Sequence, residues 1–286
     1  MVNMETYNDI FLAARKTLRA AGVEASDLEA RLIISRATGK SREELLQSSR
    51  LFLTDPSVKQ AVYEMLTRRL KGEPIAYILG EWEFFSLPFV VNESVLIPRV
   101  DTELLADEAI RLTKRHGEKS RVLDLCTGSG CIGIAIAANV PDCRVVLVDN
   151  SPPALKLCRA NAMRLVRNTT TIDADAMAPP PKLLGMLDVM VSNPPYIPTA
   201  DLITLDDSVR FYEPVHALDG GEDGFDFFRA ITANWRAVLK PGGHMLFECG
   251  INQAETLRGI MEENGFTDIR TLTDTLGIER VVIGRY

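Results

Sequence analysis

The stretch "RVLDLCTGSGCIGIAIA" at residues 121–137 combines three local patterns in one continuous run. Residues 121–126 are mostly apolar and predict a buried strand, "TGSG" predicts a tight turn, and the apolar run that follows predicts a helix over 130–139. A strand that passes through a glycine-rich turn directly into a helix is typical of a βαβ unit. The stretch therefore predicts an α/β fold with a ligand site at the carboxyl end of this strand.

The rest of the chain from about residue 99 repeats this alternation of strand and helix. Strands are expected at 121–126, 143–149, 169–173, 187–192 and 244–249, with helices at 101–115, 130–139, 153–167 and 224–239. Strands separated by helices predict a mostly parallel sheet. The last strand-like runs, "FTDIRTL" and "ERVVIGRY", follow each other with only a short turn between them and predict an antiparallel hairpin at the C-terminus.

The first 98 residues have a different sequence pattern. Residues 1–72 predict a small all-helical domain, with capping boxes at Ser26 with Glu29 and at Ser41 with Glu44, and with Asp55 and Pro56 starting a further helix. Residues 73–98 are rich in β-branched and aromatic residues and predict a β-hairpin linker with a turn near residues 86–88. The predicted organisation is thus 1–72, 73–98 and 99–286.

Composition and charge exclude several classes of protein. Residues 1–72 hold 12 Lys+Arg against 9 Asp+Glu, a net +3, and residues 73–286 hold 20 against 30, a net −10. An acidic body argues against tight nonspecific binding of nucleic acid. The five cysteines form no C-x-x-C pair and the three histidines are scattered, so no metal site is expected. No membrane-spanning run and no signal peptide are seen, and buried reduced thiols are expected, so we expect the reducing cytoplasm as the location. We expect the protein to be a monomer.

The glycine loop leaves two cofactors to be distinguished. "GSGCIG" at 128–133 matches G-x-G-x-x-G, and Asp149 follows 19 residues after Gly130, as in the NAD fingerprint. Asp124, four residues before Gly128, is unfavourable beside a pyrophosphate. A carboxylate favours the positive sulfonium and amino groups of S-adenosylmethionine, which has no phosphate. Asp149 is then expected to accept hydrogen bonds from the ribose hydroxyls.

A second motif, "SNPPYI" at 192–197, follows the strand at 187–192. Two consecutive prolines fix the backbone and donate no hydrogen bond, which a strand does not require. Because both motifs follow the carboxyl ends of strands, they are expected to share one site.

The residues "DLCTGSG" and "SNPPYI" resemble the class I S-adenosylmethionine-dependent methyltransferases of amino groups. "GEPIAYILG", "VLIPRVDTE", "YEPVHALDGGEDGFDFFR" and "LKPGGHMLFECG" narrow the resemblance to one subfamily, the glutamine methyltransferases of peptide chain release factors. The resemblance covers about residue 70 to the C-terminus. It implies the class I methyltransferase fold with a Rossmann-like sheet, release factors as partners, and S-adenosylhomocysteine as product.

The resemblance also implies roles for individual residues. The backbone of Cys126, Thr127, Gly128, Ser129 and Gly130 wraps the cofactor, with Asp124 beside it, Asp149 at the ribose and Ala176 by the adenine. The acceptor amide is held by Asn193, Pro194, Pro195 and Tyr196. The Asn193 side-chain oxygen and the Pro194 carbonyl each accept one N–H of the amide, and the prolines keep that carbonyl rigid. Cys126 stands where the family usually has Gly, and Ala176 where an aromatic residue often flanks the adenine.

Three other functions remain open at this point. The same tetrad suits the exocyclic amine of adenine, so an N6-adenine or other nucleic-acid methyltransferase is the main alternative. A noncatalytic scaffold of the same fold and an NAD oxidoreductase are disfavoured by the intact motifs. The segment "ALDGGEDG" at 217–224 is either an ordinary loop or a flap over the acceptor.

Overall fold

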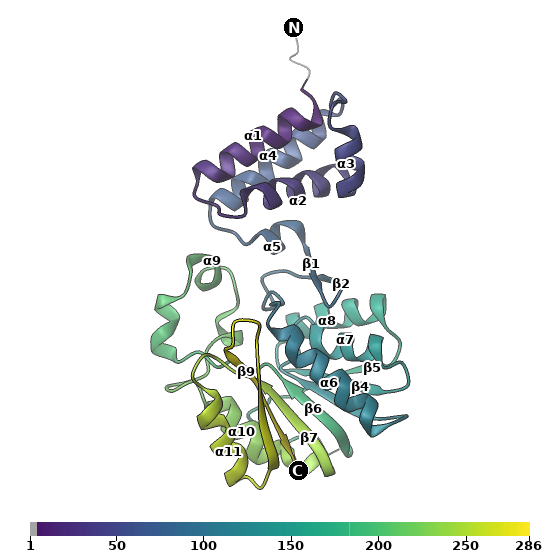
Figure 1. The fold of residues 1–286 in the computed structure, drawn as a ribbon, viewed down its shortest axis with the longest axis vertical. Coiled ribbons are helices and arrows are strands. Elements are labelled where there is room, and N and C mark those ends of the chain that lie inside the picture. The colour runs from purple at the N-terminus through teal and green to yellow at the C-terminus, as the bar shows by residue number, and fades with distance from the viewer. Residues whose placement is uncertain (1–4, 183) are drawn as a thin grey trace. The chain divides into compact units, whose positions relative to one another are not determined.

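The computed structural model describes residues 5–182 and 184–286, and the chain divides into two compact units. The smaller unit comprises the residues up to Gly80 together with Asp207–Tyr212, and the larger one comprises Glu81–Asp206 and Glu213–Tyr286. Figure 1 shows both, with helices alone in the smaller unit and a central sheet in the larger one.

The smaller unit is a helical bundle. It consists of α1 (Tyr7–Ala20), α2 (Ser26–Thr38), α3 (Arg42–Ser48), α4 (Pro56–Leu70), α5 (Ile75–Leu79) and the short α9 (Asp207–Arg210). Its core is a cluster of side chains from α1, α2, α4 and α5 that includes Leu18, Ala30 and Ile33, none of them exposed to solvent. Tyr212 attaches the 207–212 segment by donating its hydroxyl proton to the Lys71 carbonyl, at 2.8 Å.

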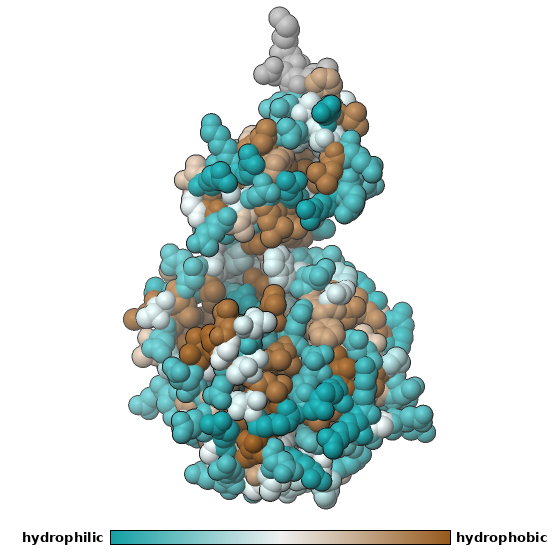
Figure 2. All heavy atoms as spheres, in the orientation of Figure 1, coloured by the Kyte–Doolittle hydropathy of each residue, from teal (hydrophilic) through white to brown (hydrophobic). Residues whose placement is uncertain are grey.

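Several large apolar side chains of this unit remain exposed, and brown patches interrupt its hydrophilic surface in Figure 2. They are Leu12, Leu28, Leu46, Leu51, Phe52, Tyr63 and Leu70. Such side chains scattered singly are normal on a protein surface, but gathered on a small bundle they favour contact with a partner.

The two predicted capping boxes have different outcomes. Ser41 and Glu44 form the reciprocal box that begins α3, and Asp55 caps α4 as expected. The box predicted at Ser26 and Glu29 is wrong. Ser26 is the first residue of α2, so the cap position falls on Ala25, which makes no side-chain hydrogen bond. The buried Glu29 carboxylate instead pairs with Arg69 of α4, at 2.7 Å.

The hairpin predicted within 73–98 is present, but it is shorter than expected. Strands β1 (Glu81–Phe84) and β2 (Leu87–Val90) pair antiparallel, whereas Ile75–Leu79 is helix and belongs to the smaller unit. A short apolar run such as "IAYIL" fits a buried helix as well as a strand. Pro74 before it and Gly80 after it, at a φ of +72°, bound it as a helix.

The larger unit is built on a seven-stranded sheet with the order β5-β4-β3-β6-β7-β9-β8. The strands are β3 (Arg121–Leu125), β4 (Arg144–Asp149), β5 (Thr169–Asp173), β6 (Leu187–Ser192), β7 (Leu239–Glu248), β8 (Thr267–Thr273) and β9 (Glu279–Arg285). The first five are parallel to one another, and β9 and β8 add the predicted antiparallel hairpin. The mostly parallel α/β fold is therefore confirmed.

Helices cover both faces of this sheet (Figure 1). On one face lie α6 (Thr102–His116), α7 (Cys131–Asn139) and α8 (Pro152–Leu165), and on the other lie α10 (Asp226–Trp235) and α11 (Ala254–Glu263). Short 3-10 turns η1 (Thr199–Thr204), η2 (Val215–Ala217) and η3 (Arg236–Val238) complete the unit. Strand β7 starts at Leu239, earlier than the predicted 244, because "LKPGG" pairs through a register shift opposite Leu187 and Val189.

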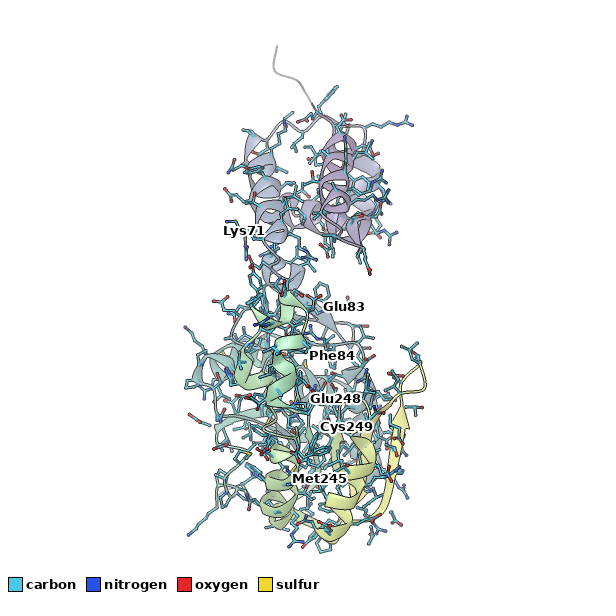
Figure 3. The ribbon with its side chains drawn as sticks, turned by 90° about the vertical axis from the view of Figure 1, so that its left-hand side faces the viewer. Lys71, Glu83, Phe84, Met245, Glu248 and Cys249 are labelled. Carbon is cyan, nitrogen blue, oxygen red and sulfur yellow. The ribbon has the colours of Figure 1, made fainter. Side chains whose placement is uncertain are left out.

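The core of the larger unit holds the sheet, its helices and the hairpin together. Met245 of β7 and Phe228 and Trp235 of α10 are fully buried between the sheet and the helices on one face. Phe84 of the hairpin is buried as well, and Figure 3 shows it with Met245 within this unit. The side chain of the buried Asn161 on α8 binds the Val90 backbone in both directions, at 2.9 and 3.0 Å, and fixes the hairpin against α8.

Candidate active site

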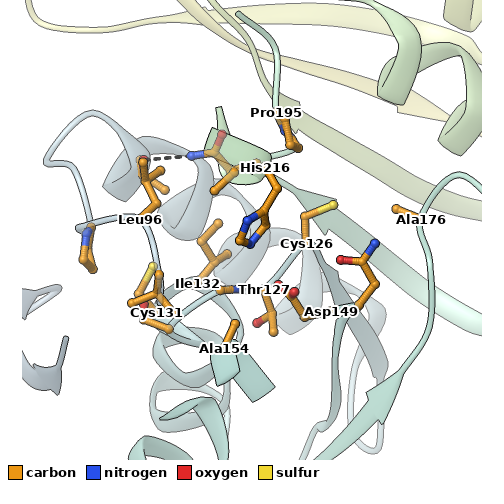
Figure 4. A pocket seen from close by; sticks show the side chains of 18 of the residues that line it. Leu96, Cys126, Thr127, Cys131, Ile132, Asp149, Ala154, Ala176, Pro195 and His216 are labelled. Atoms are coloured by element: carbon orange, nitrogen blue, oxygen red, sulfur yellow. Dashed lines mark hydrogen bonds between the residues drawn. The ribbon is translucent and has the colours of Figure 1, made fainter. Parts of the chain in front are cut away.

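A hollow of about 180 Å³ opens at the carboxyl ends of β3, β4 and β6 (Figure 4). Strand β3 lies where the chain order of the sheet reverses, with β4 on one side and β6 on the other, and parallel sheets bind ligands at such a point. The walls come from the loop before α6, the ends of the three strands and the segment around η2. They include Ser94, Leu96, Arg99, Thr102, Cys126, Thr127, Gly128, Ser129, Cys131, Ile132, Asp149, Ala176, Asn193, Pro195, His216 and Phe227.

The glycine loop after β3 has the left-handed turns that its composition predicts. Gly128 and Gly130 have φ angles of +53° and +85°, and the Thr127 amide donates to the Val148 carbonyl of β4 at 2.9 Å. Cys126 also lies in the left-handed region, at +61°. A side chain there costs about 1–2 kcal/mol relative to glycine, so Cys126 leaves strain at the wall of the site.

Asp124 lies beneath this loop and is fully buried. Its Oδ2 accepts a hydrogen bond from the Thr127 hydroxyl at 2.5 Å and from the Gly133 amide at 2.8 Å. Its Oδ1 is buried with no partner among the described residues. Burial raises the pKa of Asp124 to about 7, against those hydrogen bonds, and the nearby Asp149 adds to the rise. Asp124 thus fixes the loop and is placed to respond to a positive charge bound above it.

Asp149 ends β4 and lines the hollow. Its Oδ2 accepts from the Gly128 amide and its Oδ1 from the Ser151 amide, both at 2.9 Å. Carboxylate oxygens accept more than one hydrogen bond each, so Asp149 keeps acceptor capacity toward the hollow. It joins the glycine loop to the start of α8, and its contact with a ribose stays a prediction.

The NPPY segment follows β6 and meets the glycine loop across the hollow. Pro195 lines it, as Figure 4 shows, and so does Asn193, whose amide nitrogen lies 3.4 Å from the Thr102 hydroxyl. Pro194 is buried. The Tyr196 hydroxyl lies 3.4 Å from Glu248 Oε1, and burial raises the pKa of Tyr196 well above its usual range, so the phenol stays protonated.

The segment at 217–224 packs closely along the residues after NPPY. The Ile197 amide donates to the Leu218 carbonyl at 3.0 Å, and the Gly220 amide donates to the Ile197 carbonyl at 2.8 Å. A Cβ at Gly220 would lie 2.7 Å from Tyr196 Cα, and one at Gly224 would lie 2.4 Å from the Tyr196 carbonyl oxygen. These glycines are needed because two backbones approach here, which favours a fixed support for NPPY over a flap.

Four of the predicted site residues do not line the hollow: Asp124, Gly130, Pro194 and Tyr196. Asp124 supports the glycine loop from below. Gly130 faces inward, where a Cβ would lie 2.7 Å from Ile134 and 2.9 Å from Cys158. Their direct contact with a ligand stays a prediction.

Sequence reasoning missed Glu213, His216 and Phe227. The buried Glu213 carboxylate accepts from the Ile97 amide at 3.2 Å and pairs with Arg99, so it joins the loop before α6 to the η2 segment. Phe227 of α10 lines the hollow and packs against the core cluster that contains Ala176. It supplies an aromatic wall that position 176 lacks. The motif "YEPVHALDGGEDGFDFFR" contains Glu213, His216 and Phe227, but no spacing rule marks them individually.

Neither a metal cluster nor a membrane span is found in the described part of the chain. No group of three or more His, Cys, Asp or Glu side chains in residues 5–182 and 184–286 is arranged to hold a metal ion. Over the same residues, no helix combines the length and apolarity needed to cross a membrane.

Two family models match this chain: the PrmC N-terminal domain over residues 9–80 and the methyltransferase small domain over residues 100–205. The release factor glutamine methyltransferase of Geobacter sulfurreducens is 45% identical over 273 residues, covering 95% of this chain and 93% of that protein. The Escherichia coli protein of the same name is 37% identical, covering 92% and 93%. The chain belongs to the release factor glutamine methyltransferase family. The first model takes in α5, as the smaller structural unit does.

A solved structure supports the fold independently. The catalytic domain of hMettl16, solved in complex with the MAT2A 3′UTR hairpin 6, has a TM-score of 0.56 and 15% identity, covering 80% of this chain and 81% of that one. At this identity the likeness concerns the fold alone. The S-adenosylmethionine-dependent methyltransferase assignment rests on the relatives and the family models.

Proposed function

We propose that this chain transfers a methyl group from S-adenosylmethionine to the side-chain amide nitrogen of the glutamine in the Gly-Gly-Gln motif of peptide chain release factors. One observation carries the proposal. Asn193 and Pro195 line the same hollow as Gly128 and Asp149, although Asn193 follows Gly128 by 65 residues. A donor held by the glycine loop and an amide held by NPPY therefore meet in one place, which is the first requirement of transfer.

The residues present fit S-adenosylmethionine. The loop Cys126–Gly130 would hold its methionyl part, Asp149 its ribose and Ala176 with Phe227 its adenine. The unpartnered buried Oδ1 of Asp124 supports this fit, because a positively charged ligand nearby offsets the cost of that buried carboxylate. When bound, S-adenosylmethionine supplies a methyl group on a cationic sulfur, and transfer to the amide yields an N-methylamide, a thioether and one proton.

The NPPY residues would orient the acceptor. The Asn193 side-chain oxygen and the Pro194 carbonyl would each accept one N–H of the amide. These two hydrogen bonds draw electron density toward the amide nitrogen, which is otherwise a weak nucleophile. Both prolines lack a backbone donor and have a fixed φ, and both are buried, so little ordering remains to be done when the amide arrives. Tyr196 would lie behind the amide plane.

The helical unit would bind residues of the release factor other than the reacting glutamine. One neutral side chain offers too few contacts for specificity, so remote contacts must contribute. The exposed apolar side chains of this unit, visible as brown patches in Figure 2, and its mild basic excess support a protein-binding role. We further propose that the chain acts as a monomer in the cytoplasm. Its five free cysteines support a reducing compartment.

Labelled S-adenosylmethionine incubated with the purified protein tests the substrate. Release factor, double-stranded DNA and ribosomal RNA are offered in parallel. We expect label in the release factor alone. Label confined to DNA or RNA would overturn the proposal in favour of a nucleic-acid methyltransferase.

A further inference from the structure

One buried carboxylate beside the acceptor residues has no role in the function proposed so far. Glu248 is the last residue of β7 and only 4% exposed. Strands β6 and β7 are parallel neighbours, with Ser192 opposite Phe247, so the next residues along them are Asn193 and Glu248. Figure 3 shows Glu248 inside the larger unit beside Cys249. Glu248 is not among the residues that line the hollow, so it stands behind NPPY.

One oxygen of the Glu248 carboxylate has a hydrogen-bond partner and the other has none among the described residues. Its Oε1 lies 3.4 Å from the Tyr196 hydroxyl, and its buried Oε2 has no hydrogen-bond partner in the described part of the chain. Burial raises the pKa of Glu248 to about 6, while the nearby polar groups of Thr102 and Asn193 and the charge of Arg280 oppose that rise. The side chains of Tyr196, Thr102 and Asn193 thus all lie near the Glu248 carboxylate.

An ionised carboxylate accepts hydrogen bonds and donates none. The Asn193 amide has a donor end and an acceptor end, and its neighbours decide which way it is turned. The Thr102 hydroxyl, 3.4 Å from Asn193 Nδ2, both donates and accepts and so fixes neither orientation. Glu248 removes the ambiguity, because only the NH₂ end of Asn193 interacts favourably with it.

We propose that Glu248 is a positioning residue that turns the NH₂ end of Asn193 inward and presents its side-chain oxygen to the acceptor amide. This inference rests on the proposed function for the identity of that amide. The negative charge behind Asn193 also polarises its amide, which strengthens the oxygen as an acceptor for the N–H of the nitrogen that becomes methylated. A buried carboxylate is costly to retain for packing alone, which favours a role in the reaction.

Several charged and titratable groups lie around Glu248, and one of them is Cys131 of α7, which stays neutral because burial raises its pKa to about 12. Tyr196 comes from the NPPY segment, Cys249 follows Glu248 in the chain, and Arg280 faces it from β9. The Arg280 guanidinium is itself shared with Asp274, at 3.2 Å, and with Asp101 before α6, at 3.5 Å. Burial raises the pKa of Tyr196 and of Cys249, so both are neutral when Glu248 titrates.

The test compares Glu248→Gln with Glu248→Asp. Glutamine has the size of glutamate but carries a donor that can bind the Asn193 oxygen and turn it away from the acceptor. Aspartate is shorter but still only accepts. Glu108→Gln on α6 is the matched control, because Glu108 is a buried carboxylate paired with Arg111 and Arg270 and lies outside the hollow. Each variant is assayed for methyl transfer to release factor, for S-adenosylmethionine affinity by calorimetry and for thermal stability.

We expect Glu248→Gln to lower kcat by roughly 10- to 100-fold, as when an outer partner of an active-site group is removed, with cofactor affinity unchanged. Glu248→Asp should lose less than the isosteric glutamine, the reverse of what a packing role predicts. Glu108→Gln should change stability without changing kcat. Equal kcat in Glu248→Gln and wild type, or a greater loss in Glu248→Asp than in Glu248→Gln, overturns the inference.

The pH profile gives a readout that packing alone would not move. At saturating cofactor, the wild-type kcat should fall as the pH drops through about 6, because protonated Glu248 can also donate. Glu248→Gln should lose that acidic limb, while any limb due to Asp124 stays in both proteins. A fall in kcat centred near pH 6, as distinct from one near pH 7 due to Asp124, that is unchanged in Glu248→Gln contradicts the role of Glu248. If Glu248→Gln does not fold, Glu248→Asp is compared with wild type instead. Partial kcat that falls with decreasing pH at the wild-type position supports the inference. Loss of all activity refutes it.

A failure of the proposed function gives a different pattern. Wild-type protein would then transfer no label to release factor at all. The orientation of Asn193 can still be followed by NMR of its side-chain NH₂ group, assigned by its absence in Asn193→Ala. That resonance should shift in Glu248→Gln and stay in place in Glu108→Gln. An unshifted resonance in Glu248→Gln would refute the positioning role whatever the substrate.

Discussion

Two helical glycines of this chain should respond in opposite ways to the same substitution. Gly133 is the third glycine of the loop motif and lies in α7 against β3 and β4. A Cβ there would lie 2.3 Å from Leu147 Cδ2 and 2.9 Å from both the Cβ and the Oδ2 of Asp124. Leu147 and Asp124 are fully buried, so neither can move away freely. Overpacking of this kind costs about 1–3 kcal/mol, and the better helix propensity of alanine recovers about 0.5–1 kcal/mol.

Gly259 in α11 is the matched control. A Cβ built there meets no heavy atom of the described residues within 4 Å, so Gly259→Ala should stabilise the protein by about 0.5–1 kcal/mol through helix propensity alone. We therefore expect the two variants to differ by about 2 kcal/mol in the free energy of unfolding, measured by urea denaturation. Gly133→Ala should also weaken S-adenosylmethionine binding, because the Gly133 amide holds Asp124 under the loop. Equal unfolding midpoints for the two variants would refute the argument that the third glycine serves close packing.

Three further variants test the site and the sheet. Asn193→Ala should lower methyl transfer roughly 100-fold or more with cofactor affinity preserved, since an orienting contact is lost, and a near-normal rate would exclude Asn193 from the reaction. Asp149→Ala should weaken cofactor binding by about 1–3 kcal/mol in calorimetry, since groups that it binds lose their partner, and unchanged affinity would remove it from the site. The third concerns His116 and His244, whose ring nitrogens lie 3.0 Å apart. Burial lowers the pKa of His116, and lowers that of His244 to about 4, so the unfolded chain binds more protons below about pH 6.5. The contribution of this pair to stability should be constant above that pH and fall as the pH decreases toward 4, so the urea midpoint of the wild type should decrease relative to that of His244→Gln over this range. An identical pH dependence of the two midpoints would contradict the assignment.

The sequence predicted those features that local chemistry determines. The glycine loop, the strand ends and NPPY each have a composition that only a few conformations satisfy, and the strand order of the fold brings them together at one sheet edge. The capping box at Ser41 and Glu44 was predictable for the same reason, since its hydrogen bonds are local.

Features that depend on distant partners could not be predicted. Glu29 has the spacing of a capping residue, but its carboxylate is buried against α4 and pairs with Arg69, 40 positions away, instead of capping α2. The sequence places "IAYIL" in a hairpin linker, because short apolar runs fit either structure and nothing in these residues indicates the bundle that buries them as a helix. Glu248 lies within the predicted strand at 244–249, but its place behind Asn193 depends on the pairing of β6 with β7.

The most direct test of the account locates the methyl group. Release factor is incubated with this protein and S-adenosylmethionine, digested, and mapped by fragmentation mass spectrometry. We predict one added methyl on the side-chain amide of the glutamine in the Gly-Gly-Gln motif, absent when Asn193→Ala replaces the wild type and when that glutamine is changed to alanine. A methyl group on any other residue, or one that persists after the glutamine is replaced, would contradict the central claim that this site holds a glutamine amide.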